Sequence, residues 1–219
     1  YYARVSADLL KPHRVQSLLP GIGKTIVAHQ PKGVVGVISP WNYPMTLTAS
    51  DSVPALIALS ARVLLRSTQG ERELPLADFY RDDGIDNNAL AAGELITAVL
   101  VPPADLRSVF VKAAARTGLD YGYATLAGAL GGSNRAPKSL LLVAGSVGTV
   151  PLVLRKSVAI ILAEGLTEAS IEAAADAARD DLGEVTNLYT PPGYKKRLVR
   201  GLVRRVLNEL RRQKLPAEG

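Results

Sequence analysis

The order of its periodic segments is the feature that most constrains the fold of this chain. Strand-like apolar runs come first, at residues 62–66, 94–101, 107–114, 123–130 and 140–146. Helical spacing follows only later, in residues 168–181 and in a basic stretch at 195–214. Consecutive short strands joined by polar Gly, Pro and Asn loops are typical of one antiparallel sheet. Strands followed by helices predict an α+β fold, with that sheet packed on a C-terminal helical bundle.

The first 58 residues carry a different pattern. Residues 24–29 and 34–39 are β-rich and are separated by the turn composition Gln-Pro-Lys-Gly. They predict either a hairpin or a strand that crosses between domains. A loop is expected at residues 12–23 and a buried helix at 45–58. We read this part as a truncated α/β segment.

Two helix starts can be predicted from their capping residues. Thr167 can cap the alanine-rich helix at 168–181, because its hydroxyl can accept from a backbone N–H of the first turn. Thr190 followed by Pro191 has the composition of a cap with proline in the first turn of the basic helix.

The net charge of +6 comes largely from residues 195–214, where apolar residues repeat at helical spacing and Lys or Arg fill the other positions. This pattern predicts a packed helix with a solvated basic face. A nucleic-acid-binding surface is disfavoured, since no aromatic residue that could stack on bases interrupts the charges.

Composition excludes several kinds of chemistry. The chain has no cysteine and only two histidines, so we expect no disulfide, no cysteine catalysis and no metal site. Its N-terminal residues lack the long apolar run of a membrane span, so no membrane association is expected. A cytoplasmic location is the default expectation.

The stretch GVVGVISPWNYPMTLTASDSVPALIA at residues 33–58 resembles the aldehyde dehydrogenases, particularly those that act on succinate semialdehyde. The resemblance implies a contact with NAD(P) and makes Asn42 the amide donor to the developing oxyanion. The alternative is that Asn42 satisfies backbone groups in a turn. Aldehyde oxidation in this family needs a cysteine nucleophile, which this chain lacks, so NAD(P) is the less favoured cofactor.

From residue 59 onward the chain resembles another family. The motifs are ALSARVLLRSTQGERELPLADFY, GELITAVLVP, FVKAAARTGLDY and NLYTPPGYKKRLVRGLVRRVLNEL. They are similar to the flavin (medium) subunit of the xanthine dehydrogenase, carbon monoxide dehydrogenase and 4-hydroxybenzoyl-CoA reductase family. The resemblance implies that residues 59–103 end an FAD-binding domain. It also implies that residues 104–219 form the small C-terminal domain. By the aldehyde dehydrogenase resemblance, residues 1–58 are the aldehyde-dehydrogenase-like part.

The same resemblance implies FAD as cofactor and assigns three positions to its binding. Ile96 and Lys112 match positions that touch the flavin or its linker, and Asp51 matches a position that borders the cofactor. The alternatives are a core strand residue for Ile96 and a strand-edge lysine for Lys112. The glycine-rich loops that hold the FAD pyrophosphate in this family have no counterpart here, so we expect FAD binding to be weak or lost.

Together the two resemblances predict a fusion whose function is that of a flavoprotein-subunit remnant. In the family this subunit relays electrons through FAD and docks a molybdenum-binding large subunit and an iron-sulfur small subunit. Two alternatives stay open: a fragment of an NAD(P)-dependent aldehyde dehydrogenase, and a non-catalytic subunit-interaction module. Catalysis by the chain alone is not expected.

Overall fold

The computed structural model divides the chain into two compact units, residues 1–48 and 49–219. It describes residues 52–83, 85–103, 105–115, 122–183, 191 and 193–213, and the backbone of two short strands before them. These strands, β1 (His13–Val15) and β2 (Thr25–Val27), pair antiparallel. The loop predicted at 12–23 was therefore wrong at β1, which is too short to show a period of two in the sequence.

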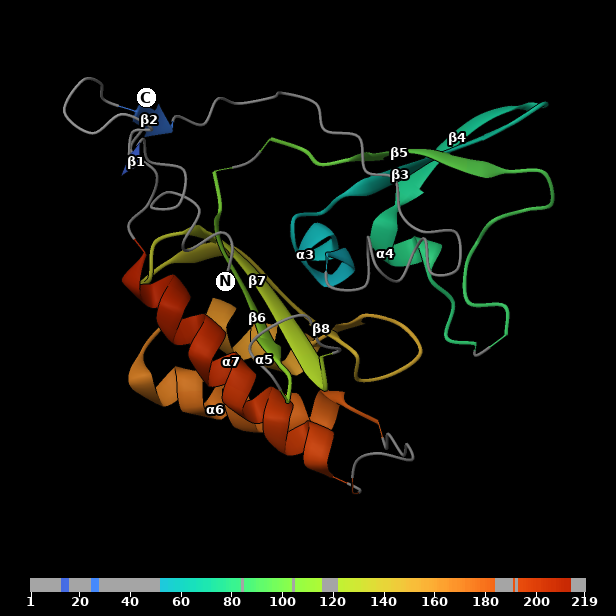
Figure 1. Ribbon diagram of the computed structural model, residues 1–219. Helices are drawn as coiled ribbons and strands as arrows, with labels where there is room; N and C mark the ends of the chain where they lie inside the picture. Colours follow the sequence, from blue (N-terminus) through green and yellow to red (C-terminus); the bar gives the residue numbers. More distant parts are fainter. Residues whose placement is uncertain are drawn as a thin grey trace. The chain divides into compact units, whose positions relative to one another are not determined.

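The second unit begins with a short helix and a three-stranded sheet (Figure 1). Helix α3 (Val53–Ala58) has Pro54 in its first turn, where the missing N–H costs nothing. The strands β3 (Arg62–Ser67), β4 (Gly70–Pro75) and β5 (Leu95–Leu100) follow, with α4 (Leu76–Phe79) after β4. Their order is β4-β3-β5 and both pairings are antiparallel.

The placement of β5 corrects the prediction of one continuous sheet. Residues 94–101 were expected to pair with the strands after them, but β5 pairs with β3. The register sets Val99 opposite Val63 and Ile96 opposite Leu65. The side chains of the two β3 residues, Val63 and Leu65, are buried. An apolar run shows that a strand has a partner without identifying it, so the sequence could not decide between the two sheets.

The four strands that follow form the second sheet in chain order. They are β6 (Arg107–Ala113), β7 (Ala124–Gly132), β8 (Pro137–Gly145) and the short β9 (Leu152–Val153). All neighbours pair antiparallel. Strand β7 is buried almost throughout because both faces of this sheet are covered, which explains its nearly continuous apolar sequence.

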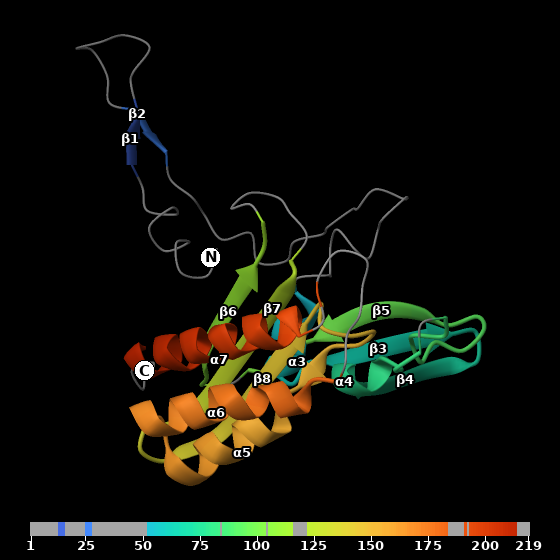
Figure 2. The same cartoon turned by 90° about the horizontal axis from the view of Figure 1, so that it is seen from below.

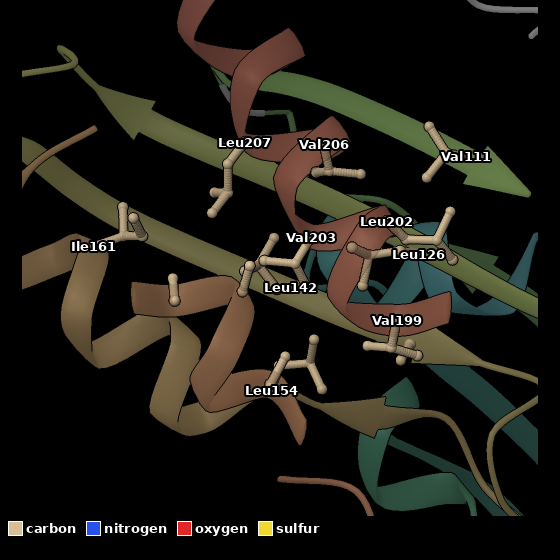
Figure 3. Packing of buried hydrophobic residues seen from close by; sticks show 14 of the residues in the cluster. Val111, Leu126, Leu142, Leu154, Ile161, Val199, Leu202, Val203, Val206 and Leu207 are labelled. Atoms are coloured by element: carbon tan, nitrogen blue, oxygen red, sulfur yellow. The ribbon is translucent and has the colours of Figure 1, made fainter. Parts of the chain in front are cut away.

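Three helices, α5 (Arg155–Glu164), α6 (Glu168–Asp181) and α7 (Tyr194–Arg212), cover one face of this sheet (Figure 2). Apolar side chains of α7, among them Val203, Val206 and Leu207, interlock with Leu126 and Leu142 of the sheet (Figure 3). The opposite face packs on α3, α4 and the three-stranded sheet, in a second cluster of buried residues. The predicted α+β fold, an antiparallel sheet on a helical bundle, is confirmed.

The helix predictions had mixed outcomes. The Thr167 cap is confirmed: the Ser170 amide donates to Thr167 Oγ1 at 3.1 Å and the Thr167 amide donates to Ser170 Oγ at 3.0 Å. Helix α7 begins at Tyr194 after Gly193, whose φ of 74° is left-handed, so Pro191 lies outside the first turn; Thr190 is outside the described residues. Helix α5 was not predicted, because its apolar run does not distinguish a strand from a buried helix.

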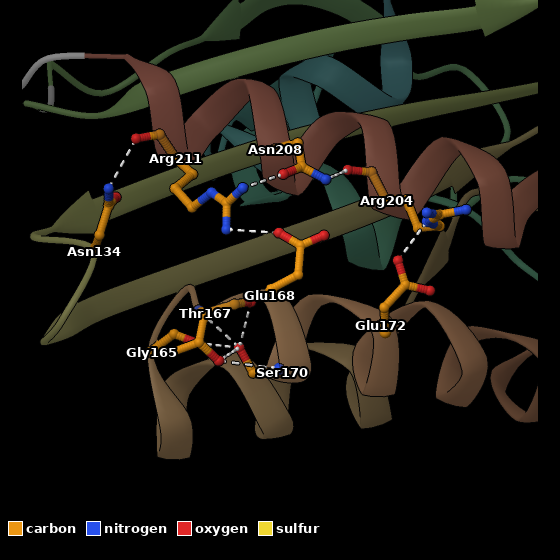
Figure 4. A network of polar contacts seen from close by, with 9 residues as sticks. All are labelled: Asn134, Gly165, Thr167, Glu168, Ser170, Glu172, Arg204, Asn208 and Arg211. Carbon is orange, nitrogen blue, oxygen red and sulfur yellow. Dashed lines mark hydrogen bonds and ion pairs between the residues drawn. The ribbon is translucent and has the colours of Figure 1, made fainter.

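The basic face of α7 is partly neutralised by α6 (Figure 4). Arg211 Nη1 lies 3.0 Å from Glu168 Oε2, and Arg204 Nε lies 2.5 Å from Glu172 Oε1. Arg200 is paired with Asp176 at 2.6 Å. The predicted solvated face is therefore narrower than expected. Exposed ion pairs of this kind each contribute little to stability. In the described part of the chain, none of the helices has the length and hydropathy needed to span a membrane.

The ion pair between Arg72 and Glu94 makes the three-stranded sheet sensitive to acid. Arg72 donates to both carboxylate oxygens, at 2.6 and 2.7 Å, and lowers the pKa of Glu94 from 4.5 to about 2. A depressed carboxyl pKa stabilises the fold above pH 4.5, and this contribution is lost as the pH falls toward 2.

We expect the urea midpoint of the unchanged chain to fall more steeply between pH 5 and pH 3 than that of an Arg72→Met variant, measured by circular dichroism. Glu94→Gln is the matched control and should show the same shallow slope as Arg72→Met. Equal slopes for all three proteins would contradict the assignment.

Candidate cofactor site

The alternation of β6 decides which of its side chains can meet a ligand. Val109 and Val111 are buried in the cluster under the helices, so Phe110 and Lys112 point to the opposite face. Phe110 packs against the second cluster. Lys112, two residues further on, is half-buried at the end of the strand.

Lys112 is one end of a row of three paired residues. Lys112 is opposite Thr125 of β7, and Thr125 is opposite Gly145 of β8. Residues directly opposite each other share a face, so we call these three residues the Lys112 row. Thr125 is fully buried, and its hydroxyl has no hydrogen-bond partner in the described part of the molecule.

Two glycines allow close packing at this end of the sheet, because a side chain at either position would crowd its neighbours. A Cβ on Gly145 would lie 2.4 Å from Thr125 Oγ1 and 2.6 Å from Pro54 Cγ, so only glycine fits between β7 and α3. A Cβ on Gly122 would lie 3.2 Å from Cγ and Cδ of Lys112, so the lysine stem passes directly over this backbone. The aliphatic stem of Lys112 is thereby placed beside the backbone that leads into β7.

Helix α7 brings further cationic and aromatic groups to the same end of the sheet. Lys195 Nζ donates to the carbonyl of Ser146, the residue after Gly145, and partial burial lowers the pKa of this lysine. Ser146 has a φ of 60°, a left-handed conformation that is unfavourable for a side-chain-bearing residue. Tyr123 and Tyr194 meet edge to face at 6.3 Å.

This arrangement suits an anion with oxygen acceptors. Lys112 provides positive charge on the face of the sheet that carries Phe110, and Lys195 comes from α7, which packs on the opposite face. The orphan Thr125 hydroxyl is fully buried between them. A phosphate group has both the charge and the acceptors. Across the described ranges, no three His, Asp or Glu side chains gather in a way that could hold a metal ion.

The predicted site residues are only partly brought together. Lys112 lies in the four-stranded sheet, whereas Ile96 lies on β5 of the three-stranded sheet, half-buried against the second cluster. That cluster also receives Phe110, which lies on the same face of β6 as Lys112, but Lys112 itself is not part of it. Asn42 and Asp51 lie outside the described residues.

Sequence reasoning missed Thr125, Gly145 and Lys195. The available signal was a single hydroxyl residue inside the otherwise apolar strand ATLAGALGG. Lys195 could not be singled out among the many cations of α7, because only the fold shows that it reaches the end of β8.

Comparison with protein families identifies two consecutive matches. Residues 42–104 match the FAD binding domain in molybdopterin dehydrogenase, and residues 109–210 match the CO dehydrogenase flavoprotein C-terminal domain. The nicotinate dehydrogenase FAD-subunit of Eubacterium barkeri is 27% identical over 186 residues, which cover 77% of this chain and 58% of that protein. The resemblance to flavin subunits of molybdenum hydroxylases is thus confirmed.

Solved structures give the same fold. Quinoline 2-oxidoreductase from Pseudomonas putida 86 aligns with 76% of this chain and 59% of its own at a TM-score of 0.65 and 21% identity. CO dehydrogenase from Oligotropha carboxidovorans aligns with 75% of this chain and 57% of its own at a TM-score of 0.66 and 22% identity. At these identities the likeness establishes the fold alone.

A separate similarity confirms the aldehyde-dehydrogenase resemblance. An NADP-type succinate-semialdehyde dehydrogenase of Mycobacterium ulcerans is 80% identical over 69 residues, which are 32% of this chain and 13% of that enzyme. The chain therefore joins sequence similar to two families, and it spans 13% of one relative and 58% of the other.

Proposed function

We propose that this chain is a fused remnant of a flavoprotein subunit, which binds FAD weakly at the Lys112 row. The observation that carries the proposal is the order of the two flavoprotein matches, residues 42–104 and then 109–210, on a fold that aligns with such subunits. When bound, FAD supplies a two-electron carrier that can also transfer single electrons. The protein residues supply binding and orientation only.

In this proposal the residues of the row have separate roles. Lys112 places its ammonium beside the FAD pyrophosphate, and Thr125, which is fully buried beside Gly145, fixes the paired strands behind it. Ile96 offers an apolar contact, and Asp51 is assigned to the border of the cofactor by the resemblance alone. The proposal also includes the division into an aldehyde-dehydrogenase-like part that ends at residue 58, an FAD-binding part that ends at residue 103, and the C-terminal domain after it.

FAD binding is expected to be weak, with a Kd of roughly 10 µM to 1 mM, because the chain lacks the family's glycine-rich loops. Quenching of flavin fluorescence on titration with the protein measures this constant. Saturable quenching that disappears after desalting supports the proposal. If the protein kept one flavin per chain after desalting, the glycine-rich loops would not be needed for tight binding. If millimolar FAD gave no quenching, the proposal that the chain binds FAD would be wrong.

Lys112→Met should weaken FAD binding about three- to tenfold, since one partly screened charge-assisted contact to phosphate is lost. Lys138→Met is the matched control, because Lys138 lies exposed on β8 and outside the row. Equal Kd values for the two variants would remove Lys112 from the site.

The 69 residues similar to succinate-semialdehyde dehydrogenases favour a second candidate, a retained nicotinamide contact near Asn42. NADPH fluorescence distinguishes the two. Saturable enhancement that is lost in Asn42→Ala supports this candidate. Flavin quenching without any NADPH enhancement supports the first.

The finer partner assignment is also a proposal. We infer that the domain at residues 104–219 docks a molybdenum-binding subunit and an iron-sulfur subunit, as expected for a flavin relay, and that it works in the cytoplasm. Co-purification with such subunits without flavin would instead favour a purely non-catalytic interaction module.

A further inference from the structure

One edge of the three-stranded sheet is apolar and open. Strand β5 pairs with β3 on one side, and no strand among the described residues pairs with its other side. Figure 2 shows β5 at the rim of the sheet, with β3 and then β4 beside it. The side chains along this edge are unusually exposed for their type: Leu95 71%, Val99 41%, Leu100 43% and Val101 47%.

The opposite edge, β4, is protected in the usual ways. It carries Glu71, Arg72, Glu73 and, at its end, Pro75, which lacks a backbone donor. Charges and proline on an edge strand prevent pairing with other chains. Strand β5, Leu-Ile-Thr-Ala-Val-Leu, has neither within its bounds, and Pro102 and Pro103 come only after Val101. The two edges of one small sheet therefore differ in their capacity to accept a further strand.

The charges nearest to β5 are already neutralised inside the sheet. Arg66 on β3 pairs with Glu71 at 2.9 Å, and Arg62 forms an ion pair with Glu73. Glu94, which precedes β5, is held by Arg72. Among the described residues beside β5, a partner strand would therefore meet charges that are already paired, so a neutral, apolar strand is the complement that fits this edge.

We propose that a second copy of this chain occupies the edge, with β5 paired antiparallel to its own copy across a two-fold axis. The neutral strand is its own electrostatic complement, and an isologous contact of this kind closes after two subunits. A bulge at Thr97, where the register with β3 shifts, limits regular pairing to the half of the strand after it.

The bulge fixes where the axis lies. With Val99 opposite Val99 of the copy, Leu100 of one chain lies opposite Ala98 of the other. The two side chains of each such pair lie on the same face of the joined sheet. Val99 faces the buried side together with Val63, and Leu100 and Ala98 face the other side. The six strands of two copies then form one continuous sheet.

The oligomeric state of the 219-residue chain tests the proposal. Light scattering behind size exclusion should give a monomer–dimer equilibrium with a Kd of about 1–100 µM. Val99→Lys places two ammonium groups on the axis and should weaken the dimer at least tenfold, whereas Ala159→Lys, on the exposed face of α5, should not. A monomer at every concentration, or equal effects of both lysines, would overturn the proposal.

The absence of cysteine allows a second test that does not need a destabilising change. In a two-fold antiparallel pair, the two Val99 Cα atoms lie within the range that a disulfide spans. Under mild oxidation, Val99→Cys should form a covalent dimer at least ten times faster than Ile85→Cys, whose side chain is 98% exposed in a loop. Equal rates for the two variants would show that the edge is not the contact.

Discussion

Replacing Gly128 with leucine is expected to unfold the C-terminal domain, at a cost of about 4 kcal/mol or more. Gly128 lies on β7 directly under α7. Even a Cβ there would be 2.5 Å from Val206 Cγ1, 3.1 Å from Leu142 Cδ2 and 3.2 Å from Leu210 Cδ1. These contacts belong to the main core cluster, so a leucine can enter only if α7 moves off the sheet.

Gly201→Leu is the matched control, because Gly201 lies on the exposed side of the same helix and its added Cβ would have no neighbour within 4 Å. Leucine favours helix over glycine by about 0.5–1 kcal/mol, so this variant should gain slightly in stability. Urea unfolding followed by circular dichroism measures both. A Gly128→Leu protein as stable as the parent would mean that α7 does not pack on β7 as described.

The second large effect is expected at Arg107, which is 5% exposed although none of the described carboxylates accepts its hydrogen bonds. Its guanidinium donates to the carbonyls of Leu210 at 3.0 Å and Gln213 at 3.2 Å, to Gly132 O at 2.9 Å and to Asn134 Oδ1 at 2.7 Å. It thus satisfies the carbonyls at the end of α7, where the helix dipole is negative.

Arg107→Met keeps the volume and removes the donors, and it should destabilise the chain by about 2–4 kcal/mol, because one buried and three partly buried acceptors lose their partner. Arg135→Met, at an exposed position in the turn before β8, is the control and should change stability by less than about 0.5 kcal/mol. Hydrogen exchange should accelerate first in the last turn of α7. If Arg107→Met left the free energy of unfolding unchanged, water would have replaced the guanidinium without cost.

The parts of the fold that could be predicted are those specified by local sequence. The strands β3, β6, β7 and β8 carry strong apolar runs, and the Thr167 cap depends on residues four apart or fewer. What failed depends on distant partners. The pairing of β5 with β3 and the helical state of 155–164 are decided by tertiary packing, which no local pattern encodes.

The candidate site likewise combines residues that the sequence could indicate with contacts that only the fold reveals. Lys112 was identified through a resemblance, and the structure places it on the face of β6 that carries Phe110. The orphan hydroxyl of Thr125 and the close approach of Pro54 to Gly145 arise from three separate segments, so they could be seen only in the fold. Whether Ile96 shares a ligand with Lys112 stays a prediction.

The most direct test of a flavoprotein-type cofactor site is an NMR titration of the isotope-labelled 219-residue chain with FAD. We predict saturable shifts concentrated on the amides of Gly122 and Gly145 and on the methyl group of Thr125, and no comparable shifts with NADPH. FAD-induced shifts scattered over α6 and β4, or no saturable shifts at millimolar FAD, would contradict this account.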